Sequence, residues 1–184
     1  MASSFTWKYT SQDVDESIKH IMKEEGFAAE AYPDPFSPLG IELRKPLAKR
    51  APRYQELYGT PWTIGYGRTG PDVMPGTKTT KDQEIFWLKV RVTEELQFLQ
   101  KLNCPTSAGL VGLIYNIGKY AFKRSQACRA LQEGRWEDAY REIAEFNKSA
   151  GKVRAGLTKR RLKEIDLLKE YLSRNLHSDT KSKA

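Results

Sequence analysis

The stretch GLVGLIYNIG at residues 109–118 is the feature of this sequence that most constrains its fold. On a helix it is apolar nearly all round, and such a helix must be buried among other elements. It is also far shorter than the roughly 20 residues that cross a bilayer. We therefore expect a helix over about 107–117 at the centre of a helical bundle.

Helical spacing of apolar residues predicts the elements around this central helix. The first, over about 12–25, follows hydroxyl residues that can cap it and ends at Gly26. A long helix follows Thr80 and Gln83, which can form a capping box. Three more amphipathic helices are expected near residues 124–133, 135–146 and 158–172.

Residues 27–76 have a different pattern, rich in proline, glycine and short aromatic stretches. Within them, 62–70 is typical of a strand and hairpin, and 52–58 is typical of one short helix. The predicted fold class is therefore α+β and predominantly helical, with a small β-hairpin lobe and a helical bundle lobe.

This pattern predicts one domain over residues 1–172. Its β lobe spans about 27–76 and its helical lobe about 80–172, and a polar tail at 173–184 follows. Cys104 and Cys128 have no CxxC spacing, so we expect two reduced thiols rather than a disulfide framework or a zinc site.

The net charge of +8 is concentrated at the C-terminal end of the chain. Residues 148–184 hold 11 Lys and Arg against 4 Asp and Glu, which leaves +1 for the remainder. Such a segment suits a polyanion, whether nucleic acid, a membrane surface or an anionic cell wall. The N-terminal residues do not resemble a signal peptide, so we expect synthesis in a cytoplasm without a membrane anchor.

Histidine is too scarce to support most hydrolytic mechanisms. His20 and His177 are the two histidines of the chain, and neither lies in a triad pattern or an HExxH motif. If the chain is an enzyme, carboxylates are its expected acid and base groups.

Two carboxylates near the end of the first helix are candidates for this role. At roughly 100° per residue, Glu25 continues the apolar face of the helix, whereas Glu24 is rotated away from it. An apolar environment disfavours the charged form of a carboxyl group, as a general acid requires near neutral pH. A structural alternative is that Glu25 pairs with an arginine of the bundle.

Asp34 follows nine residues after Glu25, in a turn between two prolines. It is expected to be accessible and ionised, although an Asx turn would explain it equally. A protonated and an ionised carboxyl group together can cleave a glycosidic bond.

Two segments, EGFAAEAYPDP and WTIGYGRTGPDVMPG, resemble the active-site signature of the phage-type lysozymes, or endolysins, of glycoside hydrolase family 24. The similarity continues in the family's order through TTKDQEIFWLKVRV, AGLVGLIYNIG, ALQEGRWEDAYREI and AGLTKRRLKEIDL. It covers most of residues 14–170, and the ordered set is far more specific than any one segment.

This resemblance implies a lysozyme-like fold and a muramidase that hydrolyses the β-1,4 bond between N-acetylmuramic acid and N-acetylglucosamine in bacterial peptidoglycan. By position, Glu25 would be the proton donor, Asp34 the second catalytic carboxylate and Thr63 the residue that orients water. Substrate contacts would come from three residues, Tyr66, Tyr115 and Asn116. No metal and no organic cofactor is implied.

The sequence departs from the family pattern in two places. Between Asp34 and Thr63 lie 28 residues, far more than the family's usual short turn, and we expect this insertion to be ordered around the helix at 52–58. It would enlarge the β lobe and touch the wall or cover the cleft, or it would be a tolerated surface insertion. Arg68 stands where many relatives have histidine.

Two other functions are compatible with parts of the sequence. A lytic transglycosylase would use Glu25 alone on the same bond, and a basic helical protein could bind nucleic acid through residues 148–184. The second leaves the Glu, Asp and Thr pattern unexplained, so we expect no nucleic-acid partner. The preferred hypothesis is a monomeric endolysin that lyses its host bacterium after holin-dependent release from the cytoplasm.

Overall fold

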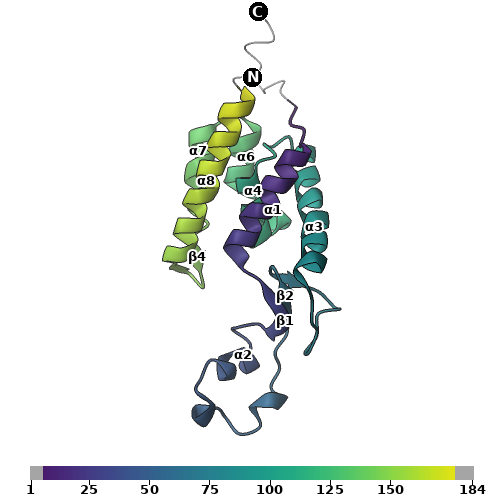
Figure 1. Ribbon diagram of the computed structural model, residues 1–184. Helices are drawn as coiled ribbons and strands as arrows, with labels where there is room; N and C mark the ends of the chain where they lie inside the picture. The colour runs from purple at the N-terminus through teal and green to yellow at the C-terminus, as the bar shows by residue number, and fades with distance from the viewer. Residues whose placement is uncertain (1–5, 177–184) are drawn as a thin grey trace, which may run out of the picture. The chain divides into compact units, whose positions relative to one another are not determined.

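The computed structural model describes residues 6–176. The chain forms two compact units (Figure 1). The sheet unit is Glu25–Leu88, and the helical unit consists of the described residues before and after it. The fold is α+β and predominantly helical, as predicted.

The helices other than α2, which is described below, contain about half of the described residues. They are α1 (Ser11–Glu25), α3 (Lys81–Lys101), α4 (Ala108–Ile117), α5 (Lys119–Lys123), α6 (Gln126–Gln132), α7 (Trp136–Ala144) and α8 (Ala155–Leu176). None of the helices in residues 6–176 combines the length and apolar character needed to cross a membrane.

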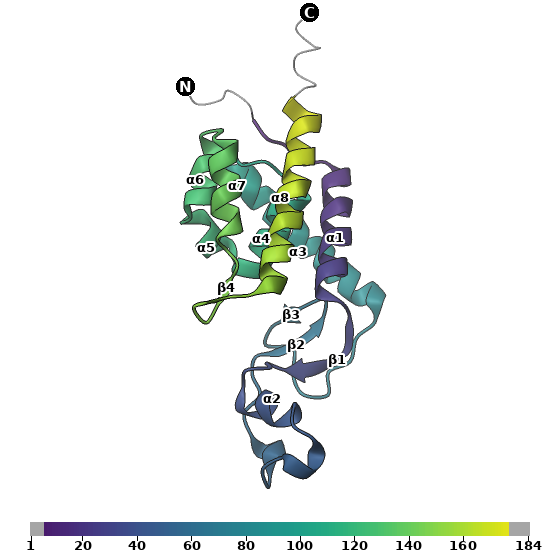
Figure 2. The same cartoon turned by 90° about the vertical axis from the view of Figure 1, so that its left-hand side faces the viewer.

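Helix α4 is the core of the helical unit, as its sequence predicts. Ser107 caps it by accepting a hydrogen bond from the Leu110 amide at 3.3 Å. All residues from Ala108 to Ile114 are buried, and the helix packs against α8. Figures 1 and 2 both show α4 in the middle of the helical unit.

Capping boxes begin α1 and α3, which explains why both helices start where the sequence predicts. At α1, the Thr10 amide donates to Asp13 Oδ2 at 2.7 Å and the Asp13 amide donates to Thr10 Oγ1 at 3.3 Å. At α3, Thr80 and Gln83 exchange the same pair of bonds, at 3.0 and 3.3 Å.

The helix predicted near residues 124–133 is confirmed as α6, which Ser125 caps through the Cys128 amide at 3.1 Å. The short helix α5 before it was not predicted. The thiols of Cys104 and Cys128 are free and buried, with their Sγ atoms 4.0 Å apart.

A second hairpin, β4 (Lys148–Ser149) with β5 (Lys152–Val153), was not predicted. Its turn residues, Ala150 and Gly151, both have positive φ. Strands of two residues carry no periodicity that a sequence could reveal.

The prediction of a polar tail from residue 173 is wrong, because α8 continues to Leu176. Tyr171 hydrogen-bonds Thr106 at 2.7 Å, and Arg174 pairs with Glu16 of α1 at 2.9 Å. These two contacts attach the C-terminal end of α8 to the rest of the helical unit. Helical periodicity alone did not indicate them. Residues 177–184 of the predicted tail, with His177, lie outside the described residues.

The sheet unit contains a three-stranded antiparallel sheet in the order β1 (Ala28–Pro33), β2 (Trp62–Gly65), β3 (Arg68–Thr69). Its core is a cluster of Ala31, Ile64 and Val73, with Trp62 packed against it. The hairpin predicted at 62–70 is confirmed.

The insertion, which we define as residues 35–62, is ordered, but not around the predicted helix at 52–58. That segment forms a single 3-10 turn, η2 (Tyr54–Glu56), because Arg53 adopts a left-handed conformation with φ 59°. The regular helix is α2 (Pro38–Leu43), which Ser37 caps through the Gly40 amide at 3.0 Å. A further 3-10 turn, η1 (Leu47–Lys49), connects the two (Figure 2).

A buried ion pair lies beneath the turn between β2 and β3. Glu84, in the first turn of α3, is 2% exposed and binds Arg68 Nη2 at 2.9 Å and Arg68 Nε at 3.0 Å. Arg68 also pairs with Asp72 at 2.6 Å, and Thr79 donates to Glu84 at 2.8 Å. Gly65 has φ +63°, and a Cβ there would lie 2.3 Å from Glu84 Oε2.

Replacing Gly65 with Ala should therefore destabilise the protein through both backbone strain and this clash. We expect the free energy of unfolding in urea to fall by about 2–4 kcal/mol. Gly76→Ala is the matched control, because Gly76 has φ +80° but open space around it. It should cost about 1 kcal/mol, and equal losses in the two variants would contradict the proposed clash.

Candidate functional site

Glu25 is the last residue of α1, and Gly26 ends the helix with φ +68°. The buried face of α1 runs through Val14, Ser17 and Ile21, and the residue after this face, Glu25, is exposed. The predicted apolar surroundings of Glu25 are therefore wrong. The last fully buried residue of this face is Ile21, and Glu25, one turn further along at the end of the helix, is exposed.

The neighbouring acid, Glu24, forms ion pairs with basic residues of α8. Its carboxylate binds Lys163 Nζ at 2.7 Å and lies 3.6 Å from Arg160 Nε. Arg160 also donates to the Glu24 carbonyl at 3.2 Å. Burial opposes ionisation of Glu24, but the hydrogen bond and charge of Lys163 outweigh it and lower the pKa of this carboxyl group. Glu24 thus fastens α1 to α8 as a structural acid.

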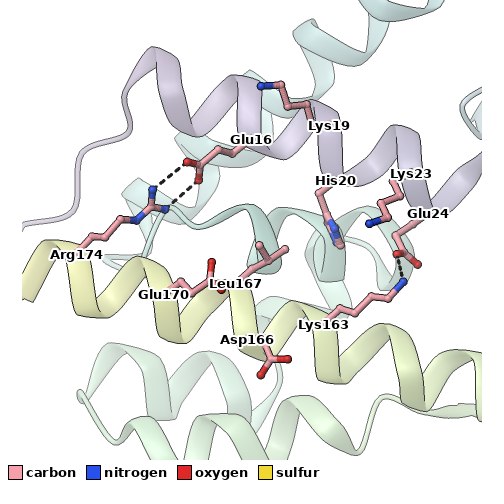
Figure 3. Close-up of a pocket in the computed structure, with 10 residues that line it drawn as sticks. All are labelled: Glu16, Lys19, His20, Lys23, Glu24, Lys163, Asp166, Leu167, Glu170 and Arg174. Carbon is pink, nitrogen blue, oxygen red and sulfur yellow. Dashed lines mark hydrogen bonds and ion pairs between the residues drawn. The ribbon is translucent and has the colours of Figure 1, made fainter.

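Glu24 also lines a groove of about 490 Å³ between α1 and α8 (Figure 3). Ion pairs lie at its two ends, Glu16 with Arg174 and Glu24 with Lys163. Nine of its ten lining residues are ionisable: Glu16, Lys19, His20, Lys23, Glu24, Lys163, Asp166, Glu170 and Arg174. None of the six predicted site residues lines this groove, so we interpret it as the charged seam between two helices.

In the sheet unit, Glu25 and Thr63 both interact with the side chain of Tyr32. Tyr32 and Thr63 are cross-strand partners in β1 and β2. Burial raises the pKa of the Tyr32 phenol, the charge of Glu25 raises it further, and a hydrogen bond with the Thr63 side chain opposes both. The phenol therefore interacts with two of the three predicted catalytic residues, Glu25 and Thr63.

Tyr32 was not among the predicted site residues. The signal was present, because alternate residues of a strand share a face and Tyr32 lies two positions before Asp34. The sequence does not show that Thr63 is the cross-strand partner of Tyr32, because 28 residues separate β1 from β2. The register of the two strands shows this pairing.

Asp34 directly follows β1 and forms the Asx turn that its position between prolines suggested. Its Oδ1 accepts a hydrogen bond from the Phe36 amide at 2.8 Å. Its own amide donates to the carbonyls of Gly59 and Pro61, both at 3.0 Å. Asp34 is thus fixed at the point where the two ends of the insertion meet.

Tyr66 is buried in the sheet unit, where its ring packs on Phe27 with centroids 5.3 Å apart. The glycines on either side of it have positive φ and form the turn between β2 and β3. Its surroundings therefore give Tyr66 a packing role, and the substrate contact implied by the resemblance stays a prediction.

Tyr115 and Asn116 belong to the helical unit, at the end of α4. The guanidinium of Arg91 lies 3.8 Å from the centroid of the Tyr115 ring and donates to the Tyr115 carbonyl at 3.3 Å. Asn116 is exposed, and its Oδ1 accepts from the buried Arg161 at 3.3 Å. Arginines therefore orient both residues.

The arginine that orients Tyr115 is held by a buried acid, Glu95. Arg91 Nε binds Glu95 Oε1 at 3.2 Å, whereas Glu95 Oε2 is buried without a hydrogen-bond partner among the described residues. Burial outweighs the charge and hydrogen bond of Arg91 and raises the pKa of Glu95 to about 7. The side chain thus changes charge near neutral pH.

Because the folded state favours protonated Glu95, its stability contribution is full below the ordinary pKa of 4.5 and is lost as pH rises through about 7. The wild type should lose about 1–3 kcal/mol relative to Glu95→Gln between about pH 5 and about pH 8. Urea unfolding at both pH values measures this difference. Glu94→Gln is the control for an exposed neighbouring acid and should keep the wild-type pH dependence; parallel profiles for wild type and Glu95→Gln would contradict the assignment.

Comparison with known proteins identifies the family. Residues 48–164 match the model of the phage lysozyme family, and the chain belongs to that family. The matched region contains Thr63, Tyr66, Tyr115 and Asn116 and begins after Glu25 and Asp34.

Relatives and solved structures agree with this membership. The endolysin of Bacillus phage B103 is 34% identical over 124 residues, which is 65% of this chain and 47% of that protein. The endolysin of Bacillus phage PZA is 35% identical over 126 residues, or 66% of this chain and 49% of that protein. The chain thus spans about half the length of these relatives.

The solved muramidase domain of SpmX from Asticaccaulis excentricus has the same fold. It is 23% identical to this chain with a TM-score of 0.64, and the alignment covers 88% of this chain and 97% of that domain. The lysozyme-like architecture implied by the sequence is confirmed.

Proposed function

We propose that this chain is a peptidoglycan hydrolase that cleaves the β-1,4 bond between N-acetylmuramic acid and N-acetylglucosamine. Membership of the phage lysozyme family supports the reaction class. The observation that carries the residue assignment is the convergence of Glu25 and Thr63 on Tyr32.

In this proposal Glu25 donates a proton to the departing glycosidic oxygen. Its place at the end of α1, followed by Gly26 and then β1, sets it beside the strand that carries Tyr32. Glu24 cannot share the role, because its ion pairs with α8 keep it ionised.

Asp34 and Thr63 would position the attacking water. Asp34 Oδ1 is occupied by the Phe36 amide, and Oδ2 accepts no hydrogen bond from residues 6–176. A carboxylate held in this way can orient water without losing its own geometry. Attack from the face opposite the leaving group would invert the anomeric centre, which requires carboxyl groups about 6.5–9.5 Å apart.

Tyr66, Tyr115 and Asn116 are the proposed substrate contacts. The Asn116 amide can bond the acetamido groups of the sugars, and the ring of Tyr115 can pack on a pyranose face. The proposed setting is that of an endolysin, the name given to the Bacillus phage relatives. The enzyme would be a monomer, made in the host cytoplasm without a nucleic-acid partner and released to the wall through holin lesions.

Glu25→Gln should reduce the release of reducing ends from purified peptidoglycan by about 10²- to 10⁴-fold, the usual contribution of a general acid. Glu24→Gln, which alters the adjacent acid, should stay within a few-fold of wild type. Mass analysis of the wild-type products should show reducing muramic acid ends. Anhydro ends would instead establish a lytic transglycosylase, and an active Glu25→Gln variant would defeat the assignment.

Tyr32→Phe tests the shared hydroxyl while keeping the ring. Loss of one hydrogen bond that orients Thr63 should lower kcat about tenfold and leave KM unchanged. Tyr58→Phe, at an exposed tyrosine of the same unit, serves as the control. A rise in KM with unchanged kcat would show that Tyr32 binds substrate rather than positioning Thr63.

A further inference from the structure

The insertion displays apolar side chains on its surface. Six of the fourteen large hydrophobic residues exposed in the described chain lie within its 28 residues: Phe36, Ile41, Leu43, Leu47, Leu57 and Tyr58. The most exposed are Phe36 at 75%, Leu47 at 71% and Tyr58 at 66%. Leu39 is the large apolar residue of the insertion that is buried. This number of exposed apolar groups in one short segment makes the insertion a candidate interaction surface.

Polar contacts, together with the one buried leucine, Leu39, hold this segment in shape. Glu42 binds Lys45 at 2.5 Å and accepts from the Ala51 amide at 2.9 Å. Arg50 donates to the carbonyls of Leu43 and Lys45 at 3.0 and 3.1 Å. The exposed apolar side chains are therefore presented by an ordered backbone and are not needed to form it.

The insertion carries a net positive charge. It contains five Lys and Arg against two Asp and Glu, a balance of +3. Both acids have basic partners within the insertion, Glu42 with Lys45 and Glu56 with Arg53 at 2.8 Å. The other three cations, Arg44, Lys49 and Arg50, have no carboxylate ion pair among the described residues.

These cations are interleaved with the apolar groups. The Arg44 guanidinium lies 5.7 Å from the centroid of the Phe36 ring, and that of Arg50 lies 5.0 Å from the Tyr54 ring. Lys49 ends the 3-10 turn η1 that begins with Leu47. Arg44 and Arg50 thus each have an aromatic ring beside them, and Lys49 lies two residues after Leu47 in the chain.

We propose that the insertion binds the surface of an anionic phospholipid bilayer. Leu47 and Phe36 would enter the boundary between headgroups and acyl chains, and Arg44 and Lys49 would bind lipid phosphates. An anionic wall polysaccharide would satisfy the cations and the aromatic rings, but it offers no hydrocarbon for Leu47, Ile41 and Leu43. The aliphatic groups therefore favour lipid.

This inference goes beyond the proposed hydrolysis, which needs no lipid. The side chains that carry it, from Phe36 to Tyr58, are not among the proposed catalytic residues, although the Phe36 amide donates to Asp34 Oδ1 at 2.8 Å. Binding of this kind is peripheral and spans no bilayer. It would hold the enzyme at a membrane surface independently of catalysis.

Co-sedimentation of the full chain with vesicles tests the proposal. Vesicles of phosphatidylglycerol mixed with phosphatidylcholine should bind the protein, and vesicles of phosphatidylcholine alone should bind it at least about tenfold less. The double variant Leu47→Ser with Tyr58→Ser, and separately Arg44→Gln with Lys49→Gln, should each weaken binding about tenfold or more. Only the charge variant should flatten the salt dependence.

The β4–β5 hairpin offers a matched control. Val153→Ser with Lys152→Gln removes one exposed apolar residue and one exposed cation outside the insertion, and it should bind vesicles like wild type. Glu25→Gln should also bind anionic vesicles like the wild type. A failure of the hydrolase proposal can therefore be distinguished from a failure of the lipid-binding proposal. Absence of binding to anionic vesicles, equal loss in the hairpin control, or binding to purified anionic wall polymer alone would each overturn the proposal.

Discussion

The ion pair of Arg68 with buried Glu84 is the interaction on which the sheet unit depends. A carboxylate that is 2% exposed requires full compensation, and it receives this from the arginine of β3 and the hydroxyl of Thr79. Because Glu84 opens α3 and Arg68 follows the β2–β3 turn, the pair fastens a small sheet to a long helix. The positions of Thr63 and of its partner Tyr32 follow from that sheet.

Adjacent acids at the end of α1 show how one helix can serve two functions. Glu24 pairs with cations of α8 and is committed to packing within the helical unit. Glu25 begins the sheet unit and interacts electrostatically with Tyr32. Adjacent residues of a helix point in directions about 100° apart. The structural carboxylate of Glu24 and the candidate catalytic carboxylate of Glu25 therefore face different surroundings.

The helices with strong apolar periodicity and side-chain caps, such as α4 and α3, were predictable because their signals are local. The turn at η2 was not, because Arg53 takes a left-handed conformation that its residue type does not indicate. In the candidate site, residue type and position pointed to Glu25 and Asp34, and the family resemblance added Thr63. The exposure of Glu25 was not predictable, because the packing of the last turn of α1 is a tertiary property. Tyr32 was missed because strand register across a long insertion is a tertiary property.

The closure of the insertion at its base has an evolutionary consequence. The Asp34 amide binds the carbonyls of Gly59 and Pro61, so the chain leaves and re-enters the sheet at nearly the same place. A loop closed in this manner can lengthen, shorten or change its chemistry while the strands at its root keep their register. Selection could thus adapt this member of the phage lysozyme family to a new cellular surface by changing one loop, while the strands that carry Tyr32 and Thr63 stay unchanged.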